Sequence, residues 1–353
     1  MATCADDALP RALAGVSGER LAATVAAHDP RHVLEDAGAA VTAEPFTVPF
    51  VPEVYAEPSV RWSGGPLAAG REVAVHLASA DRPLVRRGEL VVAGGGDPAG
   101  RWLVVPAGMT LFAAYGHAHG ALGLLVPRGV DADGWRYTIR TGPNPGPLPI
   151  LTLDTGIHAE VARAAAAGDA WLAGSTPIRR LDRPGVNRHG RWRSGTAPEL
   201  LLTAQADDAG GVAVVLEAAR VLAAALPGAA GLSVALLGAQ GSAHHARQLH
   251  KAGATPLVIH VAGAGDRADA VPVEARGPAH ALLAALDQAG RHTGLTLAPG
   301  PVPSAHRRYA AVGLAAVGIG AAAADTAVAR LVVATGLLCG HVTGWTAAGP
   351  AEP

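Results

Sequence analysis

The sequence predicts an α/β fold in which helices sandwich a mainly parallel sheet. Its last 155 or so residues alternate short, continuously apolar runs with longer stretches of helical periodicity. Continuous apolar runs are typical of strands that are buried on both faces, and their alternation with helices indicates a parallel sheet. Short strand signals and turn-rich loops in the middle of the chain predict a smaller, β-rich inserted domain.

The elements of the sheet domain follow one another from residue 199 onward. The apolar runs predict strands at 199–204, 232–238, 256–261 and 314–319. The helical periodicity predicts helices at 212–226, 243–252, 278–292 and 326–338. Ligands of such sheets bind beyond the carboxyl ends of the strands, so candidate functional residues are expected directly after each predicted strand.

The residues before 199 are predicted to belong to two different domains. Residues 1–60 hold a helical stretch at 7–28 and an extended, proline-punctuated segment at 44–49, and we assign them to the sheet domain together with 179–353. Residues 61–178 carry the strand signals of the inserted domain. The segment 176–196 is rich in Arg, Gly and Pro, which predicts an irregular return into the main domain.

Composition narrows the choice of partners and compartment. The chain of 353 residues has 28 basic and 29 acidic side chains and a formal net charge of -1, which gives no electrostatic reason to expect nucleic acid or an anionic membrane as a partner. Its 2 cysteines, Cys4 and Cys339, lie near opposite ends of the chain and provide no disulfide framework. The N-terminus lacks the basic and apolar regions of a signal peptide, so we expect a cytoplasmic protein. As a partner we expect a small-molecule or peptide-like substrate.

The most specific signal is a resemblance to a known family. The run LLLTAQADDAGGVAVVLEAARVLAAALPGAAGLSVALLGAQGS at 200–242 resembles the segment of M28-family zinc aminopeptidases in which a strand ends in Ala-His-x-Asp and a later strand in Gly-Ala-Glu-Glu. LVIHVAGAG at 257–265 and SAHRRYAAVGLAAVGIG at 304–320 are similar to later family segments in the same order. The middle of the chain, with GRWLVVPAG and HAHGALGLLVPRG, resembles the protease-associated domain often inserted in these enzymes.

The resemblance implies a site for two zinc ions, but most of its ligands are replaced. Gln205 stands at the first His position, and Asp207, with Asp208 beside it, stands at the bridging Asp position. Gln240 begins the pair that replaces Glu-Glu, and His260 stands at the Asp-Met position. Neutral amides do not balance the charge of two zinc ions, so we expect no metal and no cofactor at these residues.

The remaining polar residues support a metal-independent enzyme. Asp207 or Asp208, paired with His260 or His306, would supply acid/base chemistry on an amide, amino-acyl or peptide-like small molecule, for instance in a biosynthetic pathway. Substrate-binding groups would be Gln205, Gln240 and Ser304. Two alternatives stay open at this point: a non-catalytic binding or scaffold protein, and a zinc-dependent aminopeptidase with a rebuilt site.

Each of these residues also has a structural interpretation. Asp207 and Asp208 precede a predicted helix, where Asp commonly caps the first turn. His260 ends an apolar strand and is equally consistent with a core histidine bonded to a neighbour. The group His244, His245 and His250 has helical spacing, which favours a solvated helix face over an adventitious metal site.

Overall fold

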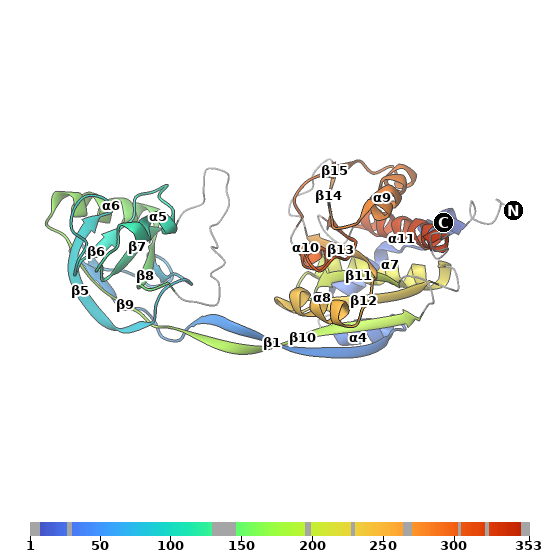
Figure 1. The fold of residues 1–353 in the computed structure, drawn as a ribbon, viewed down its shortest axis with the longest axis horizontal. Helices are drawn as coiled ribbons and strands as arrows, with labels where there is room; N and C mark the ends of the chain where they lie inside the picture. The colour runs from blue at the N-terminus through green and yellow to red at the C-terminus, as the bar shows by residue number, and fades with distance from the viewer. Residues whose placement is uncertain are drawn as a thin grey trace, which may run out of the picture. The chain divides into compact units, whose positions relative to one another are not determined.

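The computed structural model describes residues 8–26, 30–128, 146–194, 199–226, 230–263, 270–302, 305–321 and 325–346. The chain divides into two compact units, one formed by Met1–Thr47 with Pro184–Pro353 and the other by Val48–Arg183. Both crossings between the units fall inside long strands, β1 (Ala40–Val54) and β10 (Ile178–Arg193), which are neighbours in one sheet (Figure 1). The sequence places these boundaries at residues 60 and 178.

The first unit contains the predicted, mainly parallel sheet. Its strands follow the order β1-β10-β12-β11-β13-β16-β14-β15. The four parallel central strands are β12 (Gly231–Leu237), β11 (Glu199–Gln205), β13 (Leu257–Gly263) and β16 (Ala316–Ala321). β10 runs antiparallel to β12, and β14 (Val271–Arg276), which pairs with β15 (Leu297–Pro299), runs antiparallel to β16. The predicted α/β fold class is confirmed.

Helices cover both faces of this sheet. Alternate strand residues such as Leu202, Val234 and Ile259 join the larger apolar cluster, which also takes in side chains of α7 (Ala209–Ala225), α9 (His280–Thr293) and α11 (Thr326–Thr346). The intervening residues, among them Leu201 and Ala235, join a smaller cluster with side chains of α8 (Gly241–Lys251) and α10 (Ala305–Ala310). Because side chains of a strand alternate between faces, the two clusters lie on opposite faces of the sheet.

Helix α7 is apolar on nearly all sides because it packs against the sheet, α3 (Gly18–Ala26) and α11. Its one buried carboxylate, Glu217, is 4% exposed. That carboxylate accepts hydrogen bonds from the Ser17 backbone N–H at 2.7 Å and from the guanidinium groups of Arg20 and Arg220. The charge is therefore paired on several sides, as a buried carboxylate requires. Two short helices, α2 (Ala8–Ala14) and α4 (Pro30–Asp36), complete the N-terminal part of this unit.

The second unit is rich in strands, in the order β3-β2-β9-β5-β6-β7-β8-β4. Their bounds are β2 (Val60–Trp62), β3 (Gly65–Pro66), β4 (Val73–Val75), β5 (Arg82–Val92), β6 (Trp102–Val104), β7 (Gly123–Pro127), β8 (Ile150–Leu153) and β9 (Trp171–Thr176). The helices α5 (Leu111–Gly116) and α6 (Thr155–Ala167) accompany them. Trp102 is 1% exposed, and its indole N–H donates to the Arg86 carbonyl at 3.2 Å. The likeness of this unit to a protease-associated domain stays a prediction.

The segment at 44–49, predicted to be extended, lies within the strand β1 as expected. Two other sequence-based expectations differ from the structure. The segment 176–196, predicted to be irregular, contains the strand β10, which pairs with β12 from Arg188 to Arg193. The helix predicted at 7–28 is divided into α2 and α3. Among the described residues, no helix combines the length and apolar character needed to cross a membrane.

Candidate functional site

Asp208 connects the end of one strand to the start of a helix. Its Oδ1 accepts a hydrogen bond from the Gly211 backbone N–H at 3.0 Å, which caps α7. Its Oδ2 accepts from the Gly263 backbone N–H at 2.6 Å, at the end of β13. Both carboxylate oxygens are thus engaged with the backbone, in the capping role that Asp often has. Asp207 lies exposed in the adjacent turn.

The two glutamines lie at or beyond the carboxyl ends of the neighbouring strands β11 and β12. Gln205 is the last residue of β11 and is half-buried. Gln240 is exposed, precedes α8 with a φ of 62°, and makes no side-chain capping hydrogen bond. Ser304, the third predicted substrate-binding residue, lies outside the described residues. A catalytic or binding role for these side chains stays a prediction.

His260 lies in the core and not at a strand end. It is 1% exposed in the middle of β13, and its Nδ1 lies 3.0 Å from the Thr203 hydroxyl on β11. Its ring faces that of His306 on α10, with 6.3 Å between the ring centroids. Burial lowers the pKa of His260 to about 3, so the imidazole is neutral at pH 7.

His306 is fully buried beside an ion-pair network. Its Nε2 lies 3.3 Å from Oε2 of Glu274, a carboxylate on β14 that also pairs with Arg307 at 2.7 Å and Arg276 at 2.8 Å. Burial lowers the pKa of His306 as well. In the described part of the chain, no hydrogen bond or ion pair joins His260 or His306 to Asp208. The structure therefore does not bring the predicted acid/base partners into contact.

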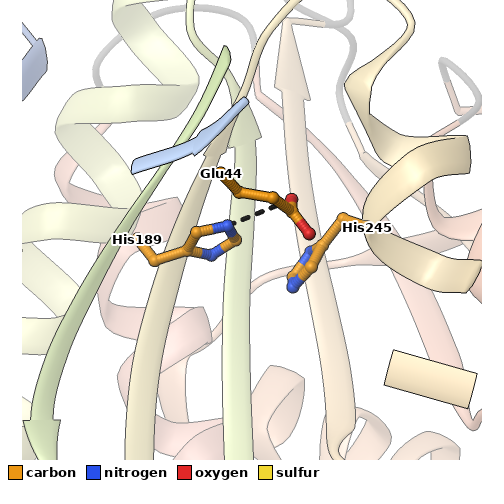
Figure 2. A group of neighbouring side chains, drawn as sticks. All are labelled: Glu44, His189 and His245. Atoms are coloured by element: carbon orange, nitrogen blue, oxygen red, sulfur yellow. Dashed lines mark hydrogen bonds and ion pairs between the residues drawn. The ribbon is translucent and has the colours of Figure 1, made fainter. Parts of the chain in front are cut away.

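A different group of side chains converges elsewhere in the first unit. Glu44 on β1, His189 on β10 and His245 on α8 each offer a ligand atom, and these atoms all lie within 4.8 Å of one another. Figure 2 shows the three side chains approaching one another from two strands and a helix. Nε2 of His189 lies 3.2 Å from Oε2 of Glu44, and the rings of His189 and His245 have centroids 4.5 Å apart.

Neighbouring groups fix the orientation of this cluster. The buried amide of Asn187 donates to Oε2 of Glu44 at 2.6 Å, and its own oxygen accepts from the Gly238 backbone N–H at 3.0 Å. The Tyr309 hydroxyl lies 2.9 Å from Nδ1 of His245. Nε2 of His244 lies 3.8 Å from Oε1 of Glu44. Asn187 thus holds the Glu44 carboxylate in place, and Tyr309 holds the His245 ring.

The surroundings set the charges of the cluster. Burial raises the pKa of Glu44, but hydrogen bonds from His189 and Asn187 outweigh this effect and lower the pKa to about 2. Burial lowers the pKa of His245 to about 4, and the neighbouring His189 acts in the same direction. At neutral pH the cluster thus contains an ionised carboxylate beside a neutral imidazole of His245.

The cluster opens onto a cavity of about 460 Å³. Glu44, His189 and His245 form part of its wall, and Glu199, Ser233 and Gln248 supply further polar groups along it. Its volume lies in the range of small-molecule sites, and a few convergent polar groups in such a cavity are typical of a binding or active site.

Sequence reasoning missed this cluster. Neither Glu44 nor His189 was a candidate, and the interpretation of His245 as part of a solvated helix face is wrong, because His245 is 6% exposed. His250 on the same helix is exposed, as expected. One signal was available: Asn187 and His189 are two residues apart, a spacing that places both side chains on the same face of a strand.

The fold of the chain resembles those of solved aminopeptidases, among them a zinc aminopeptidase and an M28 peptidase precursor. An aminopeptidase from Aneurinibacillus sp. matches with 16% identity and a TM-score of 0.64, over 96% of this chain and 93% of that chain. A zinc aminopeptidase from Bacillus subtilis matches with 14% identity and a TM-score of 0.63, over 97% and 94%. A peptidase M28 precursor from Shewanella amazonensis matches with 14% identity and a TM-score of 0.55, over 97% and 92%.

These likenesses establish the fold. No sequence profile of a protein family matches the chain, and no curated protein matches it by sequence. The residues at the strand ends do not fit the two zinc ions that the M28 resemblance implies. Gln205 and Gln240 offer neutral amides, and both oxygens of Asp208 already accept backbone hydrogen bonds.

Proposed function

We propose that this chain is a hydrolase of amide, amino-acyl or peptide-like small molecules, with its reactive groups at Glu44, His189 and His245. The observation that carries the proposal is the convergence of one carboxylate and two imidazoles on a cavity of about 460 Å³. The aminopeptidase fold supports a peptidase-like hydrolase. The residues predicted from the sequence are the weaker candidates, because Asp208 caps a helix and His260 is buried.

The chemistry of the cluster suits the activation of water. The Glu44 carboxylate, 3.2 Å from His189, orients the imidazole, as a carboxylate does for a catalytic histidine. A neutral imidazole takes a proton from water while the water oxygen bonds to the substrate carbonyl. When the carbon–nitrogen bond breaks, the same proton passes to the leaving nitrogen. The reaction then leaves the protein in its starting protonation state.

A binding protein without catalysis is the second candidate. The neutral amides of Gln205 and Gln240 at the strand ends favour it, because they form hydrogen bonds but do not exchange protons near neutral pH. Such a protein would bind peptide-like ligands without converting them. A role in a biosynthetic pathway remains a prediction for either candidate.

A panel of aminoacyl-nitroanilides, dipeptides and N-acyl amino acids tests the proposed hydrolysis. The Glu44→Gln and His189→Gln variants should lose about 100-fold or more in kcat/KM. Asp207→Asn, at an exposed turn, is the matched control and should retain the activity of the unmodified protein. Circular dichroism and thermal melting of each variant check that it is folded.

Two results would contradict the proposal. If Asp207→Asn abolishes hydrolysis while Glu44→Gln does not, the reactive centre lies at the strand ends. If no member of the panel is hydrolysed but titration calorimetry shows that Glu44→Gln weakens the binding of a peptide-like ligand, the chain is a binding protein.

A further inference from the structure

We infer that Glu44, His189 and His245 form a site for a single divalent transition-metal ion, with zinc the best match to the ligand types. This inference concerns the site of the proposed function: with an ion bound, the ion would activate water in place of the imidazole, and the three side chains would serve as its ligands. It rests on the proposed function for the use of the metal, but the binding of the ion can be measured without any substrate.

The geometry favours one ion held by all three residues. Their ligand atoms lie within 4.8 Å of one another, and the Glu44 Oε2 and His189 Nε2 atoms are 3.2 Å apart. Ligands about 2.1 Å from a tetrahedral zinc ion are separated by roughly 3.4 Å. The Glu44 and His189 pair is already close to this separation, and the ligand atom of His245 lies within 4.8 Å of both.

The ligand types fit a catalytic type of zinc site. One carboxylate and two imidazoles are a known set of three protein ligands, which leaves a fourth position for water or substrate. The cavity that the three residues line supplies space for that fourth ligand. When bound, the ion would lower the pKa of a coordinated water and polarise a substrate carbonyl. The chain's own residues would then act as ligands, and the hydrogen bond between His189 and Glu44 would be replaced by coordination.

The residues around the cluster support the same inference. A ligating carboxylate or histidine commonly bonds a second group that fixes its orientation. Asn187 does this for Glu44, at 2.6 Å, and the Tyr309 hydroxyl does it for His245, at 2.9 Å. Asn187 and Tyr309 are both buried, and neither is among the residues that line the cavity. They therefore hold the ligands without filling the cavity. We assign Asn187 and Tyr309 as positioning residues.

The site differs from the one that the M28 resemblance implies. It uses β1, β10 and the second turn of α8, and none of Gln205, Asp207 or Gln240 contributes a ligand. A chain that has lost the strand-end ligands therefore still contains a set of residues suited to one metal ion.

The experiment measures metal binding by the full chain. The purified protein is stripped with a chelator, loaded with Zn²⁺ or Co²⁺ and dialysed against metal-free buffer, and its metal is measured by mass spectrometry. We expect one ion per chain, the visible absorption of a low-coordinate Co²⁺ site with nitrogen ligands, and a higher melting temperature with Zn²⁺. Glu44→Gln and His245→Gln should abolish all three effects. Asn187→Ala and Tyr309→Phe should weaken binding by about 10- to 100-fold.

His250→Gln is the matched control, because His250 is an exposed histidine on the same helix. This variant should bind metal like the unmodified protein. Retention of less than one ion in ten chains, or a loss of binding in His250→Gln but not in folded Glu44→Gln, would overturn the inference. If a variant does not fold, the Co²⁺ spectrum of the unmodified protein decides, since a spectrum of octahedral oxygen ligation alone also overturns it.

The metal site and the proposed hydrolysis can fail separately. Hydrolysis by the stripped protein that is unchanged by Zn²⁺ would overturn the metal site and leave the hydrolase in place. One tightly bound ion without hydrolysis of any substrate in the panel would support the metal site and contradict the hydrolase.

Discussion

The buried imidazole of His260 makes a prediction about stability and pH. The folded protein keeps His260 neutral, with a pKa of about 3, whereas an unfolded histidine has a pKa near 6.5. Between these values the unfolded chain binds one more proton than the folded protein. The contribution of the neutral His260 to the free energy of unfolding is therefore fully present above about pH 6.5 and decreases as the pH falls. The slope for one group is about 1.4 kcal/mol per pH unit, which amounts to about 2 kcal/mol between pH 7 and pH 5.

The measurement is urea unfolding at pH 7, 6 and 5 for the unmodified protein and for His260→Gln. The glutamine amide can still reach the Thr203 hydroxyl, but it does not titrate. We therefore expect the unmodified protein to lose about 2 kcal/mol more than the variant between pH 7 and pH 5. His306 titrates in both proteins, so its contribution largely cancels in this difference. His250→Gln, a change at an exposed site, should keep the slope of the unmodified protein.

Equal pH slopes for the unmodified protein and His260→Gln would refute this reasoning. That result would mean that water reaches the imidazole in the folded state. A His260→Gln protein with unchanged stability and at least 100-fold lower hydrolysis would instead favour the catalytic role predicted from the sequence.

Three further predictions concern stability. Glu217→Gln should cost about 2 kcal/mol in urea unfolding, because it removes the charge that pairs with the half-exposed Arg20; a cost below about 0.5 kcal/mol would contradict this. Gly318→Ala should lower the melting temperature by the equivalent of about 2 kcal/mol, because the new Cβ would lie 2.5 Å from the His306 ring; an unchanged melting curve would show that the ring moves freely. Asp208→Ala should cost about 2 kcal/mol through the loss of a helix cap and a second backbone hydrogen bond, and unchanged urea unfolding would argue against the capping role.

Much of the first unit's fold follows from local sequence patterns. The four parallel strands and the helices α7, α8, α9 and α11 were predictable, because their sequences are continuously apolar or have a helical period. The shorter β14, β15 and α10 were not predicted. The strand β10 was not predictable in this way, because its sequence is rich in Arg and Gly and carries Pro184. Its backbone pairs with both β1 and β12, and such pairing does not depend on apolar side chains.

The candidate site was less predictable than the fold. Glu44 and His189 are 145 residues apart and meet only because β1 and β10 pair in the sheet. The burial of His245 depends on how α8 packs over that sheet. The motifs pointed instead to Asp208 and His260. Helix capping explains Asp208 and core packing in the middle of β13 explains His260, without any reaction.

The register of the sheet explains why two groups of histidines occur and why they do not form one site. His189 pairs with Ala235, Ala235 with Thr203, and Thr203 with His260, so these side chains lie in one row on the face that α8 and α10 cover. Neighbouring strands are about 4.8 Å apart, which places His189 and His260 roughly 14 Å apart across three strand steps. At that separation His260 cannot bind the same ion or the same substrate atom as His189. His189 and His245, at the β1 and β10 end of the row, line the cavity. Chemistry on this face of the sheet is therefore expected at that end.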